Sequence, residues 1–462
     1  MDRRTFIQAL LAGGVMPVER AGPAWGNPPP RNPPNVLVVL SDQETELVEH
    51  SLLRIPHREE LEKRGVHFRQ AVCAAPQCSP SRATLMTGLY PHQADVVTNV
   101  DSGSLGHPLS PQVPTLGRVF QDHGYSTGYL GKWHLGNDAR GLEAFGFSGY
   151  RPLDGDALAE AAARWITQQP SQPWLLVTSF LNPHNIYDVL ARLTPIDARA
   201  SSPRSGSGLR PDLRVRTGAS LPNNFDDDLR MKPRPQFEYL TKDQGKPTLP
   251  WGKEEWLRYR SYYLDLIERV DTQMGVILEA IKQRGEQEKT IVVYSSDHGD
   301  MGGAHRLPFK GPFMYDELLR VPLTLSYPPL FSRPLVSDAL VSSVDIVPTL
   351  IDLAGIRWPR PLSGRSLAGL VGPHPQELHR AVYAEYYAKQ HWVNPIRTIR
   401  TTDWKFNDYV KPGSDLATEM YDLRQDPGEL HNLAQSSENQ KVEQKLAQDL
   451  LGWRRQTGDP LL

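Results

Sequence analysis

Cys78, Pro80 and Arg82 occupy alternate positions in the segment of this chain whose residue types and spacing best suit chemistry. Pro80 sets the backbone angle of a first helical turn, where its missing N–H would be unpaired anyway, and Gly88 offers a helix end. The sequence therefore predicts a short helix with Cys78 at its N-terminal end. A side chain there faces free backbone N–H groups and the positive end of the helix dipole, and Arg82 returns one turn later with a fixed positive charge. This arrangement favours anionic chemistry, with a buried structural cysteine as the alternative interpretation.

Polar residues also follow the segments that read as buried strands. Residues 35–40 form an uninterrupted apolar run, which is typical of a central strand buried on both faces, and Asp42 and Gln43 come directly after it. A second predicted buried strand, residues 290–296, leads into Asp297 and His298. Ligands of open α/β sheets gather at the carboxyl ends of the strands, so Asp42 and Gln43 are placed for a site. An acidic residue after a strand is also often a helix cap, and this alternative stays open for Asp42.

Two further predicted strands end close to lysine or histidine residues, whose side chains can gain or lose a proton. A short strand over residues 125–130 runs into Gly131-Lys132-Trp133-His134, and strand alternation predicts that Lys132 and His134 share one face and reach one ligand together. The alternative is that both are solvated surface groups. A third apolar run, residues 173–181, ends just before His184.

In chain order, these motifs resemble the signatures of the sulfatase family. The motifs are Asp42-Gln43, Cys78 to Arg82, Lys132-Trp133-His134, and Asp297-His298 followed by Lys310. The resemblance covers residues from about 35 to 433. It implies an α/β fold of the alkaline-phosphatase-like type, with a large mixed, mostly parallel central sheet flanked by helices. It also implies a small C-terminal antiparallel-sheet subdomain.

The resemblance further implies the cofactors. Cys78 is expected to be oxidised by a formylglycine-generating enzyme to formylglycine, which hydrates to a gem-diol nucleophile. The expected ligands of a divalent cation are Asp42, Gln43, Cys78, Asp297 and His298. The family expectation is Ca²⁺, while the imidazole of His298 leaves Mn²⁺ and Zn²⁺ as alternatives. Gln43 departs from the family pattern, in which a second acidic residue stands at this position.

The remaining site residues receive their roles from the same resemblance. Arg82 and Lys132 are expected to steady the diol and the developing charge, and His134 to accept the proton of the second hydroxyl group. His184 or Lys310 would protonate the leaving alcohol, and both are also expected to bind substrate, as is Asn99. The predicted activity is sulfuric ester hydrolysis, with a sulfated carbohydrate as the expected substrate.

Two other functions remain open on the sequence alone. A phosphonate monoester or phosphodiester hydrolase of the same superfamily also uses a modified cysteine, and some of these enzymes pair Asp-Gln with Asp-His at the metal. The pair Lys132 and His134 argues against this alternative, since such hydrolases tend to lack it. If Cys78 stays unmodified, the chain would bind a sulfated glycan without cleaving it.

The whole chain of 462 residues carries 51 basic and 53 acidic residues, a net charge of −2, which gives no sign of a nucleic-acid partner. Its two cysteines do not make a disulfide framework. Residues 1–26 resemble a bacterial twin-arginine export signal with its linker, because Arg3 and Arg4 precede a short apolar run that is too short to span a bilayer. Export to the periplasm or the extracellular space is therefore expected, without a membrane span.

The remaining chain is predicted to divide into a catalytic domain, residues 27–374, and a C-terminal α+β subdomain, residues 375–462. Apolar spacing predicts a long helix over residues 254–284 and a closing helix over residues 438–455. Short alternating segments between residues 381 and 423 predict an antiparallel sheet. Residues 186–250 are polar and lack periodicity, which predicts long loops that are either disordered or form a substrate rim.

Overall fold

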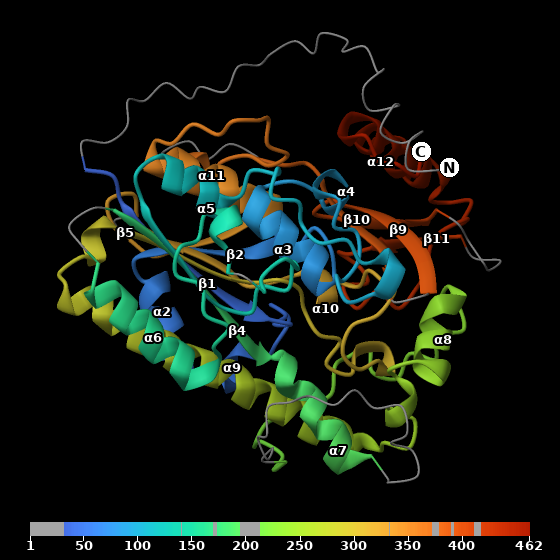
Figure 1. The fold of residues 1–462 in the computed structure, drawn as a ribbon. Helices are drawn as coiled ribbons and strands as arrows, with labels where there is room; N and C mark the ends of the chain where they lie inside the picture. Colours follow the sequence, from blue (N-terminus) through green and yellow to red (C-terminus); the bar gives the residue numbers. More distant parts are fainter. Residues whose placement is uncertain are drawn as a thin grey trace.

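A seven-stranded sheet forms the centre of the molecule (Figure 1). The computed structural model describes residues 32–139, 141–169, 173–194, 213–331, 333–371, 378–389, 392–410 and 417–462. The strands are β1 Asn35–Asp42, β2 Gly65–Val72, β3 Ser126–Gly131, β4 Trp174–Pro183, β5 Thr290–Ser296, β6 Leu323–Ser326 and β7 Leu335–Ser342. Their order is β3-β4-β1-β5-β6-β2-β7, and β6 runs antiparallel to both of its neighbours while the other pairs are parallel. The predicted large, mixed and mostly parallel sheet is thus confirmed.

Helices cover both faces of this sheet. The α-helices are α2 Pro56–Glu62, α3 Cys78–Thr87, α4 Pro91–Ala94, α5 Leu116–Asp122, α6 Gly155–Thr167, α7 Leu190–Leu193, α8 Arg234–Lys242, α9 Lys253–Gln283, α10 Asp316–Leu319, α11 Ile346–Ala354 and α12 Gln440–Thr457. Short 3-10 helices are η1 His50–Leu52, η2 Gly103–Leu105, η3 Glu143–Phe145, η4 His184–Val189, η6 Lys246–Thr248, η7 Gln287–Lys289, η8 Ala304–Arg306, η9 Ser343–Asp345 and η10 Leu367–Val371. In the part of the chain described above, no helix has the length and apolar character needed to cross a membrane.

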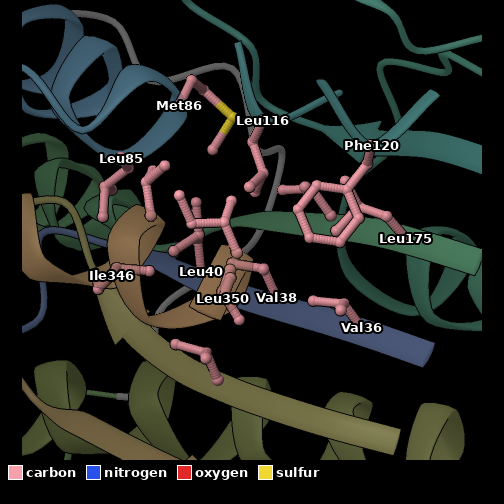
Figure 2. Close-up of a cluster of buried hydrophobic side chains, with 14 of the residues drawn as sticks. Val36, Val38, Leu40, Leu85, Met86, Leu116, Phe120, Leu175, Ile346 and Leu350 are labelled. Carbon is pink, nitrogen blue, oxygen red and sulfur yellow. The ribbon is translucent and has the colours of Figure 1, made fainter. Parts of the chain in front are cut away.

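The alternation of side chains along β1 explains the three layers. Val36, Val38 and Leu40 point to one face, where they pack with residues of α3, α5 and α11 (Figure 2). Leu37 and Val39 point to the other face and pack with α6 and α9. Because both faces of β1 are buried, residues 36–40 of this strand are all apolar. Asp42 is the last residue of β1, so it lies at the carboxyl end of the central strands.

A second, antiparallel sheet closes the chain, as expected from the sequence. It consists of β8 Val382–Lys389, β9 Trp392–Arg400, β10 Trp404–Tyr409 and β11 Thr418–Asp422, in the order β11-β10-β9-β8. One face packs under α12 through Leu446, Leu450 and Trp453. Residues of β8, including Val382 and Ala384, pack instead with Val72 and Leu319 of the main body. The small sheet is therefore held against the large one by a shared apolar cluster.

Two local predictions differ from the structure. Part of the segment 186–250 is helical, since η4 extends into it and α7, α8 and η6 lie within it, whereas residues 195–212 fall outside the described ranges. The strand before Lys132 ends at Gly131, so Lys132 and His134 lie in the loop that follows it and do not alternate along a strand. His134 has a positive φ of 55°, and the Trp133 side chain between them is buried in the core. The predicted export signal, residues 1–26, lies outside the described residues.

Candidate active site

Cys78 is the first residue of α3 and is almost completely buried. The helix ends at Gly88, which adopts the left-handed conformation at φ 67°, as the sequence predicts. Three nitrogen atoms surround the Cys78 sulfur: Lys310 Nζ at 3.2 Å, His298 Nε2 at 3.3 Å and Lys132 Nζ at 3.5 Å. Burial alone would raise the pKa of the Cys78 thiol, but the charges of Lys132 and Lys310 hold that pKa well below its ordinary value. The environment of this side chain therefore favours an anion.

Arg82 joins the two aspartates that end neighbouring strands. Its Nη2 donates to Asp42 Oδ2 at 2.9 Å, and its Nε donates to Asp297 Oδ2 at 2.9 Å. Its Nη1 donates to the Lys132 carbonyl and to Ser179 Oγ, both at 2.7 Å. The fork geometry of a guanidinium group suits this double recognition, and it fixes both carboxylates relative to α3. The structure thus places Arg82 against the carboxylates, where it acts on the site through them.

Gln43 is held with a defined orientation of its amide. Its Nε2 donates to Asp300 Oδ2 at 2.7 Å, and its Oε1 accepts from Lys310 Nζ at 2.6 Å. Asp300 is itself buried and accepts hydrogen bonds at Oδ1 from Tyr259 Oη and from the Gly302 N–H, both at 2.7 Å. Because the Asp300 carboxylate accepts and never donates, it selects the amide orientation that turns the Gln43 oxygen toward Lys310.

Asp42, Cys78, Asp297 and His298 bring four potential ligand atoms within 4.8 Å of one another. His298 Nδ1 lies 2.9 Å from the Gly299 carbonyl, so this nitrogen carries the proton and Nε2 presents a lone pair to the cluster. Asp42 Oδ2 is bonded to Arg82 and Lys132, whereas the buried Asp42 Oδ1 has no hydrogen-bond partner among the described residues. An orphaned carboxylate oxygen and an aligned imidazole lone pair are what a bound cation would satisfy.

His134 and Asn99 border the same cysteine from the other side. The His134 ring lies near Asp101, with Nε2 at 3.8 Å from Asp101 Oδ1. Burial lowers the pKa of His134, but its interactions with the nearby Asp101 and Cys78 raise that pKa above its ordinary value overall. Asn99 Oδ1 accepts from the Ser79 N–H at 3.0 Å, so this side chain also serves the first turn of α3.

His184, at the start of η4, completes the predicted set. Its ring packs on Tyr187 at a centroid distance of 5.0 Å. Burial, together with the charges of Lys310 and Lys132, holds the pKa of His184 well below its ordinary value, so its ring is neutral near neutral pH. A cavity of about 380 Å³ opens above these groups and is lined by Cys78, Asn99, Lys132, His134, His184 and Lys310. We call Asp42, Cys78, Asp297 and His298 the cation cluster. The structure therefore brings the predicted residues to the cavity or to this cluster, except that Arg82 and Gln43 reach the site through their hydrogen bonds to Asp42, Asp297 and Lys310.

Sequence reasoning missed several residues that shape this site. Asp300 stands three residues after Asp297, in the same Asp-His-Gly-Asp segment, and that short spacing was the available signal. Ser179 lies inside β4, and Lys389 ends a strand of the C-terminal sheet. Their proximity to the site depends on tertiary packing, for which a single sequence carries no local signal.

Comparison with known proteins identifies the architecture. The Sulfatase family model matches residues 34–356, and the model of the N-sulphoglucosamine sulphohydrolase C-terminal region matches residues 303–456. The chain belongs to the sulfatase family. As a sulfatase it is a sulfuric ester hydrolase, with the alkaline-phosphatase-like fold that the motifs implied.

Individual sulfatases resemble this chain over most of its length. A Delta 4,5-hexuronate-2-O-sulfatase of Bacteroides thetaiotaomicron is 31% identical over 83% of this chain and 80% of its own. An N-acetylglucosamine-6-O-sulfatase of the same organism is 25% identical over 92% of this chain and 87% of its own. Among solved structures, a 2-O GAG sulfatase superposes with a TM-score of 0.80 at 26% identity, covering 93% of both chains.

Proposed function

We propose that this sulfatase hydrolyses sulfate esters of a carbohydrate, with a formylglycine derived from Cys78 and a divalent cation, in an exported bacterial protein. The observation that carries the proposal is the position of Cys78 between two groups of side chains. Lys132, Lys310, His134 and His184 line the cavity with it, and Asp42, Asp297 and His298 bring their potential ligand atoms close to its sulfur. Relatives whose names specify sulfated hexuronate and N-acetylglucosamine support a carbohydrate as the substrate class.

The residues beneath Cys78 fit a divalent cation. Asp42, Asp297 and Gln43 would supply oxygen ligands and His298 a nitrogen ligand, which is compatible with the proposed Ca²⁺ and also with Mn²⁺ or Zn²⁺. The unpaired Asp42 Oδ1 gives this fit a physical basis, because a buried carboxylate oxygen without a partner is costly. When bound, the cation would supply Lewis-acid stabilisation of the negative charge on the sulfate group.

The reaction begins with attack of the formylglycine gem-diol on sulfur. One diol hydroxyl group, having first lost its proton to solvent, would form the new S–O bond as the bond from sulfur to the alcohol oxygen breaks. Lys132 and Lys310 contact the Cys78 sulfur, so their ammonium groups lie where they would stabilise the charge of the diol and of the sulfate oxygens. Arg82 positions Asp42 and Asp297 for this step through its two ion pairs.

The departing alcohol oxygen then needs a proton. In the unmodified chain, burial lowers the pKa of Lys310, but Cys78 and then Asp42 and Asp297 raise it above its ordinary value. The two carboxylates remain after Cys78 is oxidised, so Lys310 holds a proton before substrate arrives. His184 is neutral in the free site and gains basicity only when the negative sulfate group enters. Lys310 is therefore the first donor in our scheme, and His184 binds the ester and stands as the alternative donor.

Release of sulfate regenerates the aldehyde. His134 accepts the proton of the second diol hydroxyl, the C–O bond to the sulfated oxygen breaks, and sulfate leaves. His134 Nδ1 is buried and without a hydrogen-bond partner among the described residues, which leaves a nitrogen available for this transfer. Water then adds to the aldehyde and restores the diol.

The proposal is tested by sulfate release from a panel of monosulfated hexoses, hexosamines and hexuronates, together with an aryl sulfate and an aryl phosphonate. The protein is co-produced with a formylglycine-generating enzyme, the aldehyde is verified by mass spectrometry, and Cys78→Ala is the control. Release of sulfate from a sugar by the wild type and not by the control is expected. Hydrolysis of the phosphonate alone would favour the phosphonate monoester hydrolase alternative. An unmodified thiol in protein from the native host would instead favour a non-hydrolysing glycan binder.

Export is tested on the full chain in a bacterial host. Residues 1–26 are proposed to direct the folded protein through the twin-arginine pathway to the periplasm or beyond. Substitution of Arg3 and Arg4 by lysine is expected to retain the protein in the cytoplasm, measured by cell fractionation. Unchanged export of that variant would contradict this part of the proposal.

A further inference from the structure

Part of the active-site cavity is built by residues that take no part in the proposed chemistry. Gln77, Gln244, Tyr386 and Lys389 line the cavity together with the groups around Cys78. We call these four residues the second wall. Gln77 precedes α3, Gln244 follows α8, and Tyr386 and Lys389 belong to β8, so three segments distant in sequence converge here.

Lys389 and Asp243 form an ion pair at this second wall. Lys389 Nζ donates to Asp243 Oδ2, and the ammonium group also lies 5.3 Å from the centroid of the Tyr239 ring. The side chains of Lys389 and Asp243 are 15% and 31% exposed, respectively, so both are partly shielded and still accessible to solvent. Lys389 lines the cavity, and Asp243 directly precedes Gln244, which also lines it. A shielded pair of this kind presents strong hydrogen-bond donors and acceptors without a net charge.

The pair is held firmly relative to the nucleophile. The Ala388 carbonyl, one residue before Lys389, accepts from Gln77 Nε2 at 3.1 Å and from Thr98 Oγ1 at 2.7 Å. Gln77 is the residue directly before Cys78. The end of β8 is therefore tied to the segment that carries the nucleophile, and the distance between Lys389 and Cys78 is fixed by the fold.

The helix that leads to Asp243 is anchored as well. In α8, Gln236 Nε2 donates to Glu419 Oε1 of the C-terminal sheet at 2.8 Å, and Tyr239 Oη donates to the Pro308 carbonyl at 2.9 Å. Pro308 stands two residues before Lys310. The ion pair thus joins the two parts of the chain at the cavity, and little conformational entropy remains to be lost when a ligand binds there.

A sugar hydroxyl group both donates and accepts hydrogen bonds, and a carboxylate and an ammonium group side by side satisfy both roles. A second anionic group at this wall would instead meet a lysine whose charge Asp243 already balances. We propose that Lys389 and Asp243 bind hydroxyl groups of the pyranose ring that bears the sulfate ester, with Gln244 as a neighbouring contact. This inference rests on the proposed function and specifies how the same site distinguishes a sugar sulfate from other sulfate esters.

Two variants of opposite charge separate hydroxyl binding from a general electrostatic effect. Lys389→Met removes a positive charge, whereas Asp243→Asn removes a negative charge. If the pair influenced the site only through its electric field, the first variant would weaken binding of the sulfate group and the second would strengthen it. If the pair binds hydroxyl groups, both variants lose contacts with the sugar.

We therefore expect both variants to lower kcat/KM for the best sugar sulfate of the panel by about 10- to 100-fold, chiefly through KM. The inhibition constant of inorganic sulfate, which carries no ring, is expected to change by no more than about threefold in either variant. Lys242→Met is the matched control, because Lys242 pairs with Glu238 on the surface at 3.0 Å and its side chain is 64% exposed. Thermal unfolding of each variant verifies folding, and Gln244→Ala tests the same wall without breaking the ion pair.

Opposite effects of the two charge variants on kcat/KM would overturn the inference, as would a kcat/KM equal to that of the wild type. Equal losses in kcat/KM and in sulfate inhibition would also overturn it, because the defect would then lie in the sulfate pocket. If the wild type with verified formylglycine releases no sulfate from any sugar of the panel, the proposed function fails and the inference falls with it.

Discussion

The glutamine at position 43 leads to a prediction about the buried pair that it forms with Asp300. The family pattern has an acidic residue at this position, yet Gln43→Glu should destabilise this protein. The substitution would replace the N–H···O contact of 2.7 Å with two carboxylate oxygens facing each other. At that separation and an effective dielectric constant of 20, two unit charges repel by about 6 kcal/mol. Lys310 Nζ, which now donates to Gln43 Oε1 at 2.6 Å, would attract the new carboxylate and offset part of this repulsion.

A proton shared between the two carboxylates costs less free energy than leaving both of them charged. Keeping a carboxyl group of ordinary pKa protonated at pH 7 costs about 4 kcal/mol, and the hydrogen bond that the shared proton makes returns about 1–2 kcal/mol. The free energy of unfolding of Gln43→Glu should therefore fall by about 2–3 kcal/mol at pH 7. The shared proton gives the folded state the higher pKa, so this loss shrinks as the pH falls toward about 4.5 and grows as the pH rises.

The second substitution, Asp300→Asn, turns the argument into a double-mutant cycle. Asp300 Oδ1 accepts the bonds from Tyr259 and Gly302, so an asparagine oxygen would keep them and its Nδ2 would donate to the carboxylate introduced by Gln43→Glu. Asp300→Asn alone instead sets two amide donors against each other. The double variant should be more stable than the sum of the single effects by about 3 kcal/mol.

Urea unfolding of the wild type, the two single variants and the double variant measures the coupling energy between positions 43 and 300. EDTA in each sample removes any contribution from a bound cation. Gln273→Glu is a matched control, because Gln273 donates to Asp156 at 2.9 Å and Asp156 is exposed to solvent. The free energy of unfolding of Gln273→Glu should fall by less than about 1 kcal/mol. A Gln43→Glu variant as stable as the wild type, or a double variant no better than the summed single losses, would refute the assignment of the amide orientation to Asp300.

Three further predictions concern other parts of the structure. Cys78→Ser should accept sulfate once and then stall, because a simple ester lacks the second hydroxyl group; mass spectrometry should find the sulfated protein, and full steady-state turnover would exclude the diol scheme. Arg82→Lys should lower the unfolding free energy by about 3–5 kcal/mol and weaken Ca²⁺ binding in calorimetry, because one amine cannot pair with both Asp42 and Asp297. Burial would raise the pKa of Glu46, but hydrogen bonds from neighbouring histidines lower that pKa to about 2. The contribution of Glu46 to the free energy of unfolding should therefore be complete above about pH 4.5 and disappear as the pH falls toward 2, and acid unfolding of Glu46→Gln should lack this pH dependence.

The central strands were predictable because burial on both faces leaves a mark on the sequence. β1 contains the continuous apolar run 36–40, β5 contains the run 291–294, and each strand leads into residues of the cation cluster. β2 carries His67, Arg69 and Gln70 and has no such run, although it lies inside the sheet between β6 and β7. Its partners come from residues more than 250 positions later, so its pairing could not be inferred from local pattern.

The site residues divide in the same way. Residues that stand at strand ends or at the start of a helix were predicted, because the fold places such positions together. α8 was missed, since its Phe237 is exposed and its Tyr239 is buried, without a helical apolar stripe. Lys389 was missed because its role depends on how the C-terminal sheet docks beside Cys78, which no local feature of β8 reveals.

The charge balance of the site connects Gln43 to the reaction. Around Cys78, the cations Arg82, Lys132 and Lys310 are matched by the carboxylates of Asp42, Asp297 and Asp300. A divalent cation would therefore leave the loaded site positive, which favours a sulfate ester with its single negative charge. An acidic residue in place of Gln43 would remove half of that excess while also repelling Asp300. In this protein the negative charge is carried instead by Asp300, which bonds to Gln43 and lies outside the cation cluster. There it orients the Gln43 amide oxygen and leaves the sulfate pocket more positive.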